Sequence, residues 1–196
     1  MQARVVYQLP GAKITDDARL FVDTNVWKCL TYTKATIKYT GKANIYATFI
    51  ANAVKHNAAL YTSALCYPEL AHIIEATECD IYNTLAGTAI TLKKFREGTA
   101  ERESVVAEVE TAWSQVEAIS SIISLTLDST ALSKARSAFC TYPLDGYDLF
   151  FVDQMASAGV SAIITDDVDF IYVPNIDVYT CNADSIGRAR LFKKLE

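Results

Sequence analysis

The sequence predicts an α/β protein with a central, mostly parallel sheet. Short apolar runs alternate with longer segments of helical periodicity along the chain. The four prolines are scattered, and no repeat, low-complexity tract or linker interrupts this pattern. The chain has 196 residues, of which 51% are hydrophobic and 21% charged, as expected for one globular domain with one core. We therefore expect a single domain over residues 1–196, folded as three α/β/α layers.

Short apolar runs predict the strands, and turn residues follow several of them. The first strand comes after an N-terminal extension, residues 1–18. In chain order, strands are expected at Arg19–Val22, Ala59–Tyr61, Ile122–Leu127, Ser161–Ile164 and Asp177–Tyr179.

Helices are predicted between these strands from 3.6-residue periodicity and capping residues. The first begins just past Asp23 with Thr24 or Asn25 as its cap, and Asp128 and Asp145 are expected to cap two later helices. Residues 78–121 read as a helical hairpin joined at residues 97–99. Helices are expected at residues 44–56, 65–76, 80–96, 100–119, 129–139 and 146–158, with a short one in the C-terminal tail.

Composition excludes several classes of protein. No long uncharged apolar run and no signal peptide are present, which predicts a cytoplasmic protein without a membrane span. The five cysteines are widely spaced, so neither a disulfide framework nor a zinc ribbon is expected. No phosphate-binding or serine-hydrolase loop motif appears. The net charge of −5 argues against nonspecific nucleic-acid binding through bulk charge, although a metal-binding acidic site remains compatible with it.

Aspartates stand directly after two of the predicted strands. Asp23 follows the first strand, and Asp166 and Asp167 follow the strand at residues 161–164. In open parallel sheets, ligands bind outside the carboxyl ends of the strands. A carboxylate beside a buried strand loses part of its hydration and needs a partner, for which a divalent cation is suited.

Two further acids lie near predicted helix starts. Glu69 is in the first turn of the helix at residues 65–76, and Asp148 lies three residues after Asp145. Helices in such a sheet begin at the edge where strands end, so Asp23, Glu69, Asp148 and Asp167, hereafter the four acids, can converge on one rim. Taken singly, each has a simpler interpretation as a turn former, a helix cap or a solvated first-turn residue.

The order of four segments resembles the PIN-domain nucleases, including the VapC-like and PilT N-terminus-like proteins. These segments are V-D-T-N-V-W, S-A-L-C-Y-P-E-L, L-D-G-Y-D-L-F-F-V-D-Q-M and I-I-T-D-D-V-D-F, and the resemblance spans roughly residues 19–179. It implies catalytic and metal-binding roles for the four acids and an auxiliary metal-binding role for Asp169. Thr24, Asn25 and Thr165 match the family's supporting polar residues. Asp166 stands where the family often has asparagine, so either Asp166 or Asp167 can be the fourth acid, and register favours Asp167.

The resemblance implies a Mg²⁺- or Mn²⁺-dependent endoribonuclease that hydrolyses RNA, and a possible toxin of a toxin–antitoxin pair. These hard cations prefer oxygen ligands, which the four acids offer. The resemblance also implies two possible partners, an antitoxin protein and a second copy of this chain in a homodimer. The dimer surface would involve residues 44–56 and 80–96. The stretch from about residue 78 to 121 is long beside the compact PIN toxins, which leaves the toxin role open while the PIN fold stands.

Basic and aromatic residues are candidates for contact with the RNA. Each basic cluster taken alone is more simply a solvated helix face. The candidates are Lys34, Lys38 and Lys42, then Lys93, Lys94 and Arg96, then Lys134 and Arg136, with Tyr32, Tyr39 and Tyr147 for base stacking.

Two alternatives remain open. One is a PIN-like fold without catalysis that binds RNA or protein, although such a module has no need to concentrate acids. The other is a haloacid-dehalogenase-type phosphatase, which requires an aspartate two residues after the first one, where this chain has Asn25.

Overall fold

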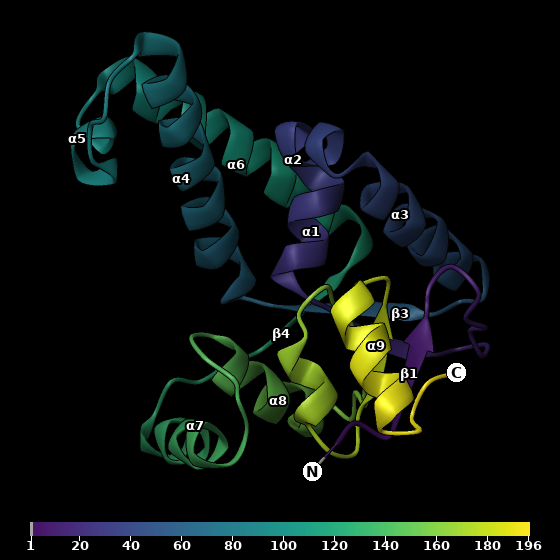
Figure 1. Ribbon diagram of the computed structural model, residues 1–196. Coiled ribbons are helices and arrows are strands. Elements are labelled where there is room, and N and C mark those ends of the chain that lie inside the picture. The colour runs from purple at the N-terminus through teal and green to yellow at the C-terminus, as the bar shows by residue number, and fades with distance from the viewer. Residues whose placement is uncertain (1) are drawn as a thin grey trace.

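The predicted α/β class is confirmed by the computed structural model, which describes residues 2–196 (Figure 1). Its centre is one six-stranded sheet with the strand order β1-β6-β5-β2-β3-β4, in which every neighbouring pair is parallel. The strands are β1 (Val5–Gln8), β2 (Arg19–Val22), β3 (Ala59–Ser63), β4 (Ser121–Ile123), β5 (Ala162–Ile164) and β6 (Asp177–Thr180).

Helices cover both faces of this sheet and complete three layers. Figure 1 shows α1 to α6 on one side and α7, α8 and α9 on the other. The helices are α1 (Thr24–Thr31), α2 (Thr33–Lys38), α3 (Thr40–Lys55), α4 (Cys66–Ala86), α5 (Leu92–Arg96), α6 (Thr99–Ile119), α7 (Ser129–Thr141), α8 (Asp148–Ser157) and α9 (Ala183–Leu191), with a 3-10 turn η1 (Asp169–Tyr172).

The order of the strands creates a switch point between β2 and β5. From β2 the chain moves outward through β3 to β4 on one side. It then returns through α7 and α8 to β5 on the other side of β2, and continues outward to β6. The connections that leave β2 and β5 therefore diverge, and ligands of open parallel sheets bind at the carboxyl ends of strands at such a point.

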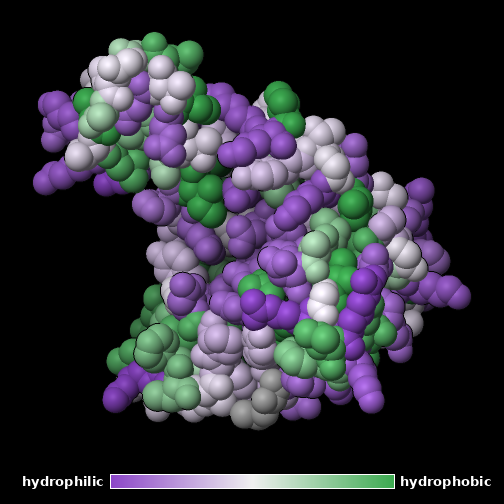
Figure 2. Space-filling model, viewed as in Figure 1, coloured by the Kyte–Doolittle hydropathy of each residue, from purple (hydrophilic) through white to green (hydrophobic). Residues whose placement is uncertain are grey.

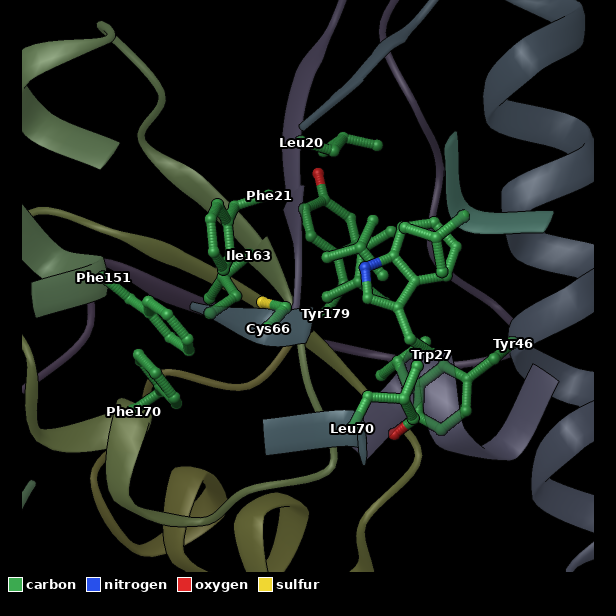
Figure 3. Packing of buried hydrophobic residues seen from close by; sticks show 14 of the residues in the cluster. Leu20, Phe21, Trp27, Tyr46, Cys66, Leu70, Phe151, Ile163, Phe170 and Tyr179 are labelled. Carbon is green, nitrogen blue, oxygen red and sulfur yellow. The ribbon is translucent and has the colours of Figure 1, made fainter. Parts of the chain in front are cut away.

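Apolar side chains fill both faces of β2 because successive residues of a strand point to opposite faces. Figure 3 shows Phe21, Ile163, Phe151 and Phe170 gathered on one side. The ring centroids of Phe21 and Phe151 are 5.3 Å apart, which joins β2 to α8. On the other face, Trp27 of α1 is fully buried and its Nε1 donates a hydrogen bond of 3.1 Å to Thr62 Oγ1 of β3. This packing fixes the start of α1 over the sheet.

The N-terminal extension contributes a strand that sequence reasoning did not predict. β1 pairs with β6 at the sheet edge. Arg4 forms a two-pronged ion pair with Asp177 of β6. The Tyr7 ring stacks on that of Tyr179 with centroids 4.6 Å apart. β1 is only four residues long, V-V-Y-Q, so its apolar run is too short to identify it as a strand from the sequence alone.

The helical hairpin also differs from the prediction. No helix ends between residues 76 and 80, because α4 runs without a break to Ala86 and ends at Gly87, whose φ of 62° is left-handed. The long partners are α4 and α6, with the short α5 at their far end (Figure 1). Residues 124–127, predicted as strand, lie beyond the end of β4.

Two of the predicted caps are wrong. Tyr147 rather than Asp145 is the N-cap of α8, and Asp23 rather than Thr24 or Asn25 is the N-cap residue of α1. Neither N-cap side chain accepts a capping hydrogen bond. The Asp128 cap is confirmed by its bond to the Ala131 amide. Within residues 2–196, no helix has the length and apolar character to cross a membrane.

Candidate active site

Asp23 lies at the switch point with its side chain almost fully buried. It follows β2 directly, and its amide donates to the Ile164 carbonyl of β5 at 3.0 Å. Only 2% of the residue is exposed. Its carboxylate accepts a 2.7 Å hydrogen bond at Oδ2 from Thr165 Oγ1 instead of capping α1. Burial raises the pKa of Asp23, this hydrogen bond opposes the rise, and the charges of Glu69 and Asp167 add to it.

Glu69 reaches the same region from the first turn of α4. Its Oε2 accepts a 2.7 Å hydrogen bond from Oγ1 of Thr24, which is fully buried at the start of α1. Burial raises the pKa of Glu69 as well, although the Thr24 bond and the charge of Lys28 lower it. The D-T-N segment thus supplies both an acid and the hydroxyl that orients a second acid, while half-buried Asn25 follows them.

Asp167 is held by the turn after β5. Its amide donates to Thr165 Oγ1 at 2.9 Å, and its Oδ1 accepts from the Asp169 amide at 2.8 Å. One hydroxyl therefore contacts Asp23 and the backbone of Asp167 together. Asp169 begins η1, and its pKa is raised by partial burial and by the charges of Asp167 and Asp145.

Asp148 completes the group as the first residue of α8. Burial raises its pKa strongly, and the next causes are the charges of Asp23, Asp167 and Glu69. The four acids come from four separate segments of the chain. Their charges raise the pKa of Asp148, so they lie close enough to repel one another. A carboxylate at a helix start is favoured by the exposed amides of the first turn, which explains how α8 tolerates a half-buried acid there.

Asp166 is directed away from the four acids. Its Oδ2 lies 2.6 Å from Lys42 Nζ, and its Oδ1 lies 2.9 Å from the Tyr46 hydroxyl. Both oxygens are thereby bound to residues of α3. Of the two aspartates that the sequence left as alternatives, Asp167 is the one whose charge acts on Asp23, Glu69 and Asp148.

The donor set suits a hard divalent cation. Every candidate ligand is a carboxylate oxygen, and across residues 2–196 none of the four acids forms an ion pair with a lysine or arginine. As they stand, no three or more acidic, histidine or cysteine side chains in that range are arranged to hold an ion together. Binding would therefore require the carboxylates to move toward the ion. The positive charge of the ion would then offset the repulsion between the carboxylates.

Several basic residues expected to contact RNA form ion pairs within the protein instead. Most partners lie on another helix or turn, and Glu97 directly follows the helix that carries Lys94. The pairs are Lys34 with Glu78, Lys42 with Asp166, Arg96 with Glu75, Lys94 with Glu97 and Lys134 with Asp153.

The three candidate stacking tyrosines differ in exposure. Tyr32 is only 1% exposed, and its hydroxyl donates to Glu78 at 2.6 Å, so its predicted role in base stacking is wrong. Tyr39 and Tyr147 are 37% and 39% exposed. The Nζ of Lys38 lies 5.3 Å from the centre of the Tyr39 ring. Hydrophilic residues line the hollow between the α4–α6 projection and the rest of the molecule in Figure 2.

Sequence reasoning assigned Asp145 only a capping role. Its charge instead raises the pKa of Glu69, Asp148 and Asp169, so it lies near the four acids. The following residue, Gly146, has a φ of 48°, which turns the chain before α8 begins. The D-G-Y-D spacing is the signal that could have placed Asp145 here, since the glycine separates it from the helix that it was expected to cap.

Comparison with known proteins finds similarity among solved structures alone. No family model and no curated protein matches the sequence. Among solved structures, the chain is similar to one in the crystal structure of VapBC2 from Rickettsia felis bound to a DNA fragment from their promoter. The sequences are 10% identical, the TM-score is 0.49, and the alignment covers 83% of this chain and 98% of the other. So low an identity transfers no residue from that protein to this one.

Proposed function

We propose that the protein is a divalent-metal-dependent ribonuclease with Asp23, Glu69, Asp148 and Asp167 as its catalytic, metal-binding acids. The observation that carries the proposal is that buried Asp23 and half-buried Asp148 lie beside two further acids, and that none of the four has an ion-pair partner in residues 2–196. Such an arrangement destabilises the protein unless a cation balances it. The order of the motifs in the sequence, which resembles PIN-domain nucleases, supports the same conclusion.

The residues around the four acids suit this role. The hydroxyls of Thr24 and Thr165 each donate to one oxygen of a carboxylate, Glu69 Oε2 and Asp23 Oδ2. A carboxylate accepts at two oxygens, so each acid keeps capacity for a ligand while its orientation is fixed. When bound, Mg²⁺ or Mn²⁺ would activate a water and stabilise the leaving oxygen of a phosphodiester. Asp169 would assist from the start of η1.

The substrate that we propose is single-stranded RNA. Exposed aromatic rings with adjacent cations suit unpaired bases and their backbone. Tyr39 with Lys38 offers this combination. Tyr147 immediately precedes Asp148 and adds a second exposed ring beside the four acids. The toxin role, the antitoxin partner and the homodimer rest on the family resemblance and stay predictions.

The test compares the rate of metal-dependent RNA cleavage by the Asp23→Asn variant with that of the wild type. Asparagine keeps the shape of Asp23 and loses the charge, so the cleavage rate should fall by orders of magnitude. In chelator the variant should melt at the same temperature as the wild type or higher, because one charge leaves a crowded acidic group.

The assay compares both proteins on single-stranded RNA in Mg²⁺, in Mn²⁺ and in chelator, with thermal melts in chelator. Equal rates for variant and wild type would exclude Asp23 as a catalytic ligand. An absence of metal-dependent cleavage by the wild type would favour the non-catalytic PIN-like module.

A further inference from the structure

A network of hydrogen bonds joins helix α3 to the turn that carries Asp167. The hydroxyl of Tyr46 lies 3.1 Å from the Thr165 carbonyl and 2.9 Å from Asp166 Oδ1, so its proton is shared between these two acceptors. The same hydroxyl oxygen accepts from the Cys181 amide at 3.3 Å. Tyr46 is fully buried, and Figure 3 shows its ring among the core side chains.

Two more residues complete this network around Asp166. Lys42, one turn before Tyr46 on α3, contacts Asp166 Oδ2 at 2.6 Å. Asn182 Nδ2 donates to the Asp166 carbonyl at 2.6 Å, while Asn182 also caps α9. Both carboxylate oxygens and the backbone oxygen of Asp166 are therefore bound. We call Lys42, Tyr46, Asp166 and Asn182 the brace.

The brace acts on the turn whose two ends contact the four acids. Thr165, before Asp166, donates to Asp23, and Asp167, after Asp166, belongs to the four acids. A shift of Asp166 would move both neighbours because the three residues are covalently joined. Lys42 also balances the charge of Asp166, which would otherwise add to the repulsion around Asp167.

We propose that Tyr46 and Lys42 are positioning residues, which set the place of Asp167 and of the Thr165 hydroxyl through Asp166 and thereby determine the affinity of the site for a divalent cation. The inference rests on the proposed function. It assigns Lys42 to the positioning of the metal site, whereas the sequence suggested that Lys42 binds the RNA backbone. Partners that orient metal ligands commonly change metal affinity tenfold or more when they are removed.

The test measures Mn²⁺ binding by calorimetry in the absence of RNA. Tyr46→Phe removes the hydroxyl and keeps the ring, so Mn²⁺ affinity should fall about tenfold, with a parallel loss of cleavage rate at subsaturating Mn²⁺. The matched control is Tyr32→Phe. It also removes a buried tyrosine hydroxyl hydrogen bond, to Glu78, and should lower stability while Mn²⁺ affinity stays at the wild-type value.

Lys42→Met is the second variant, because its side chain is 41% exposed and the fold should tolerate the change. It should weaken Mn²⁺ binding without RNA present, whereas a residue that only binds RNA would leave Mn²⁺ affinity unchanged and raise KM.

Wild-type Mn²⁺ affinity in Tyr46→Phe or in Lys42→Met would overturn the positioning role of the brace while leaving the proposed function intact. An equal loss of affinity in Tyr32→Phe would overturn it too, since the effect would then be general destabilisation. A wild-type protein that binds no Mn²⁺ would instead overturn the proposed function, and the brace with it.

Discussion

Thr165 is the residue on which the arrangement of the acids depends most directly. It is fully buried, and its hydroxyl donates to Asp23 and accepts from the Asp167 amide. The predicted family role for this threonine was only that of a supporting polar residue. The structure gives it a specific geometry, because one oxygen atom links an acid after β2 to the backbone of an acid after β5.

Replacing Thr165 tests how the orientation of Asp23 and Asp167 matters, because the charge of the site stays the same. Thr165→Val keeps the side-chain shape and removes the hydroxyl, which leaves the Asp167 amide without its partner and Asp23 without its donor. We expect a loss of about 1–3 kcal/mol in the free energy of unfolding, and a cleavage rate reduced at least tenfold.

Thr165→Ser is the matched control, because it retains the hydroxyl and loses only a methyl group. Urea denaturation and the RNA cleavage assay measure both quantities. A valine variant as active as the serine variant would show that this hydroxyl does not orient the acids.

For individual residues, the sequence predicts the place in the fold better than the surroundings of the side chain. Asp23 and Asp167 could be identified because they directly follow apolar runs, and the end of a strand fixes where the next residue lies. The burial of Tyr32 and the pairing of Lys42 with Asp166 could not, because both depend on contacts between segments 46 and 124 residues apart. Periodicity along one helix contains no information about such contacts.

Among the elements, the α4–α6 hairpin depends on an ion-pair cluster centred on Glu75. The carboxylate of Glu75 is buried on α4 and contacts Arg96 of α5 and Arg102 of α6. The hydrogen bond from Arg96 is the largest cause that lowers the pKa of Glu75. Burial opposes it, and the charges of both arginines and of His72 add to it. This cluster links all three helices. Its centre, Glu75, lies further along α4 than Glu69.

The cluster gives the hairpin a pH-dependent contribution to stability. The folded-state pKa of Glu75 lies below its ordinary value of 4.5, so its contribution is fully present above that pH and is lost as the pH falls through the lowered value. Glu75→Gln should therefore lower the free energy of unfolding by about 2 kcal/mol at pH 7, and by much less near pH 3.

Urea denaturation of both proteins at the two pH values measures this difference. Glu97→Gln, which removes the exposed pair with Lys94, should change stability little at either pH. A constant gap between Glu75→Gln and the wild type from pH 7 to pH 3 would refute the ionic origin of the contribution.

Element boundaries could be predicted where a local signal exists and not elsewhere. β2 and the Asp128 cap match their predictions because apolar runs and capping residues are local. β1 was missed because a four-residue edge strand draws its stability from β6 and from the Arg4–Asp177 pair, which are remote in sequence. The length of α4 was missed because no glycine or proline occurs between Pro68 and Gly87 to mark an end.

For the whole molecule, the alternation of strands and helices predicted the α/β class, while the order of the strands had to come from the structure. That order places β2 beside β5, and so brings the segments around Asp23 and Asp167 together at one edge of the sheet. The convergence of the four acids is a consequence of topology. No local pattern encodes it, although the positions of the acids at strand ends and helix starts are compatible with it.

A crystal structure of the protein grown with Mn²⁺, with anomalous diffraction data to locate the metal, would show whether the four acids form one metal site. We expect an anomalous peak at the carboxyl ends of β2 and β5, with Asp23 and others of the four acids within about 2–2.6 Å of it, directly or through water. The peak should be absent from Asp23→Asn crystals grown in the same way. A wild-type structure whose carboxyl groups remain apart with no peak among them, or whose peak lies elsewhere, would show that the four acids do not form a metal site.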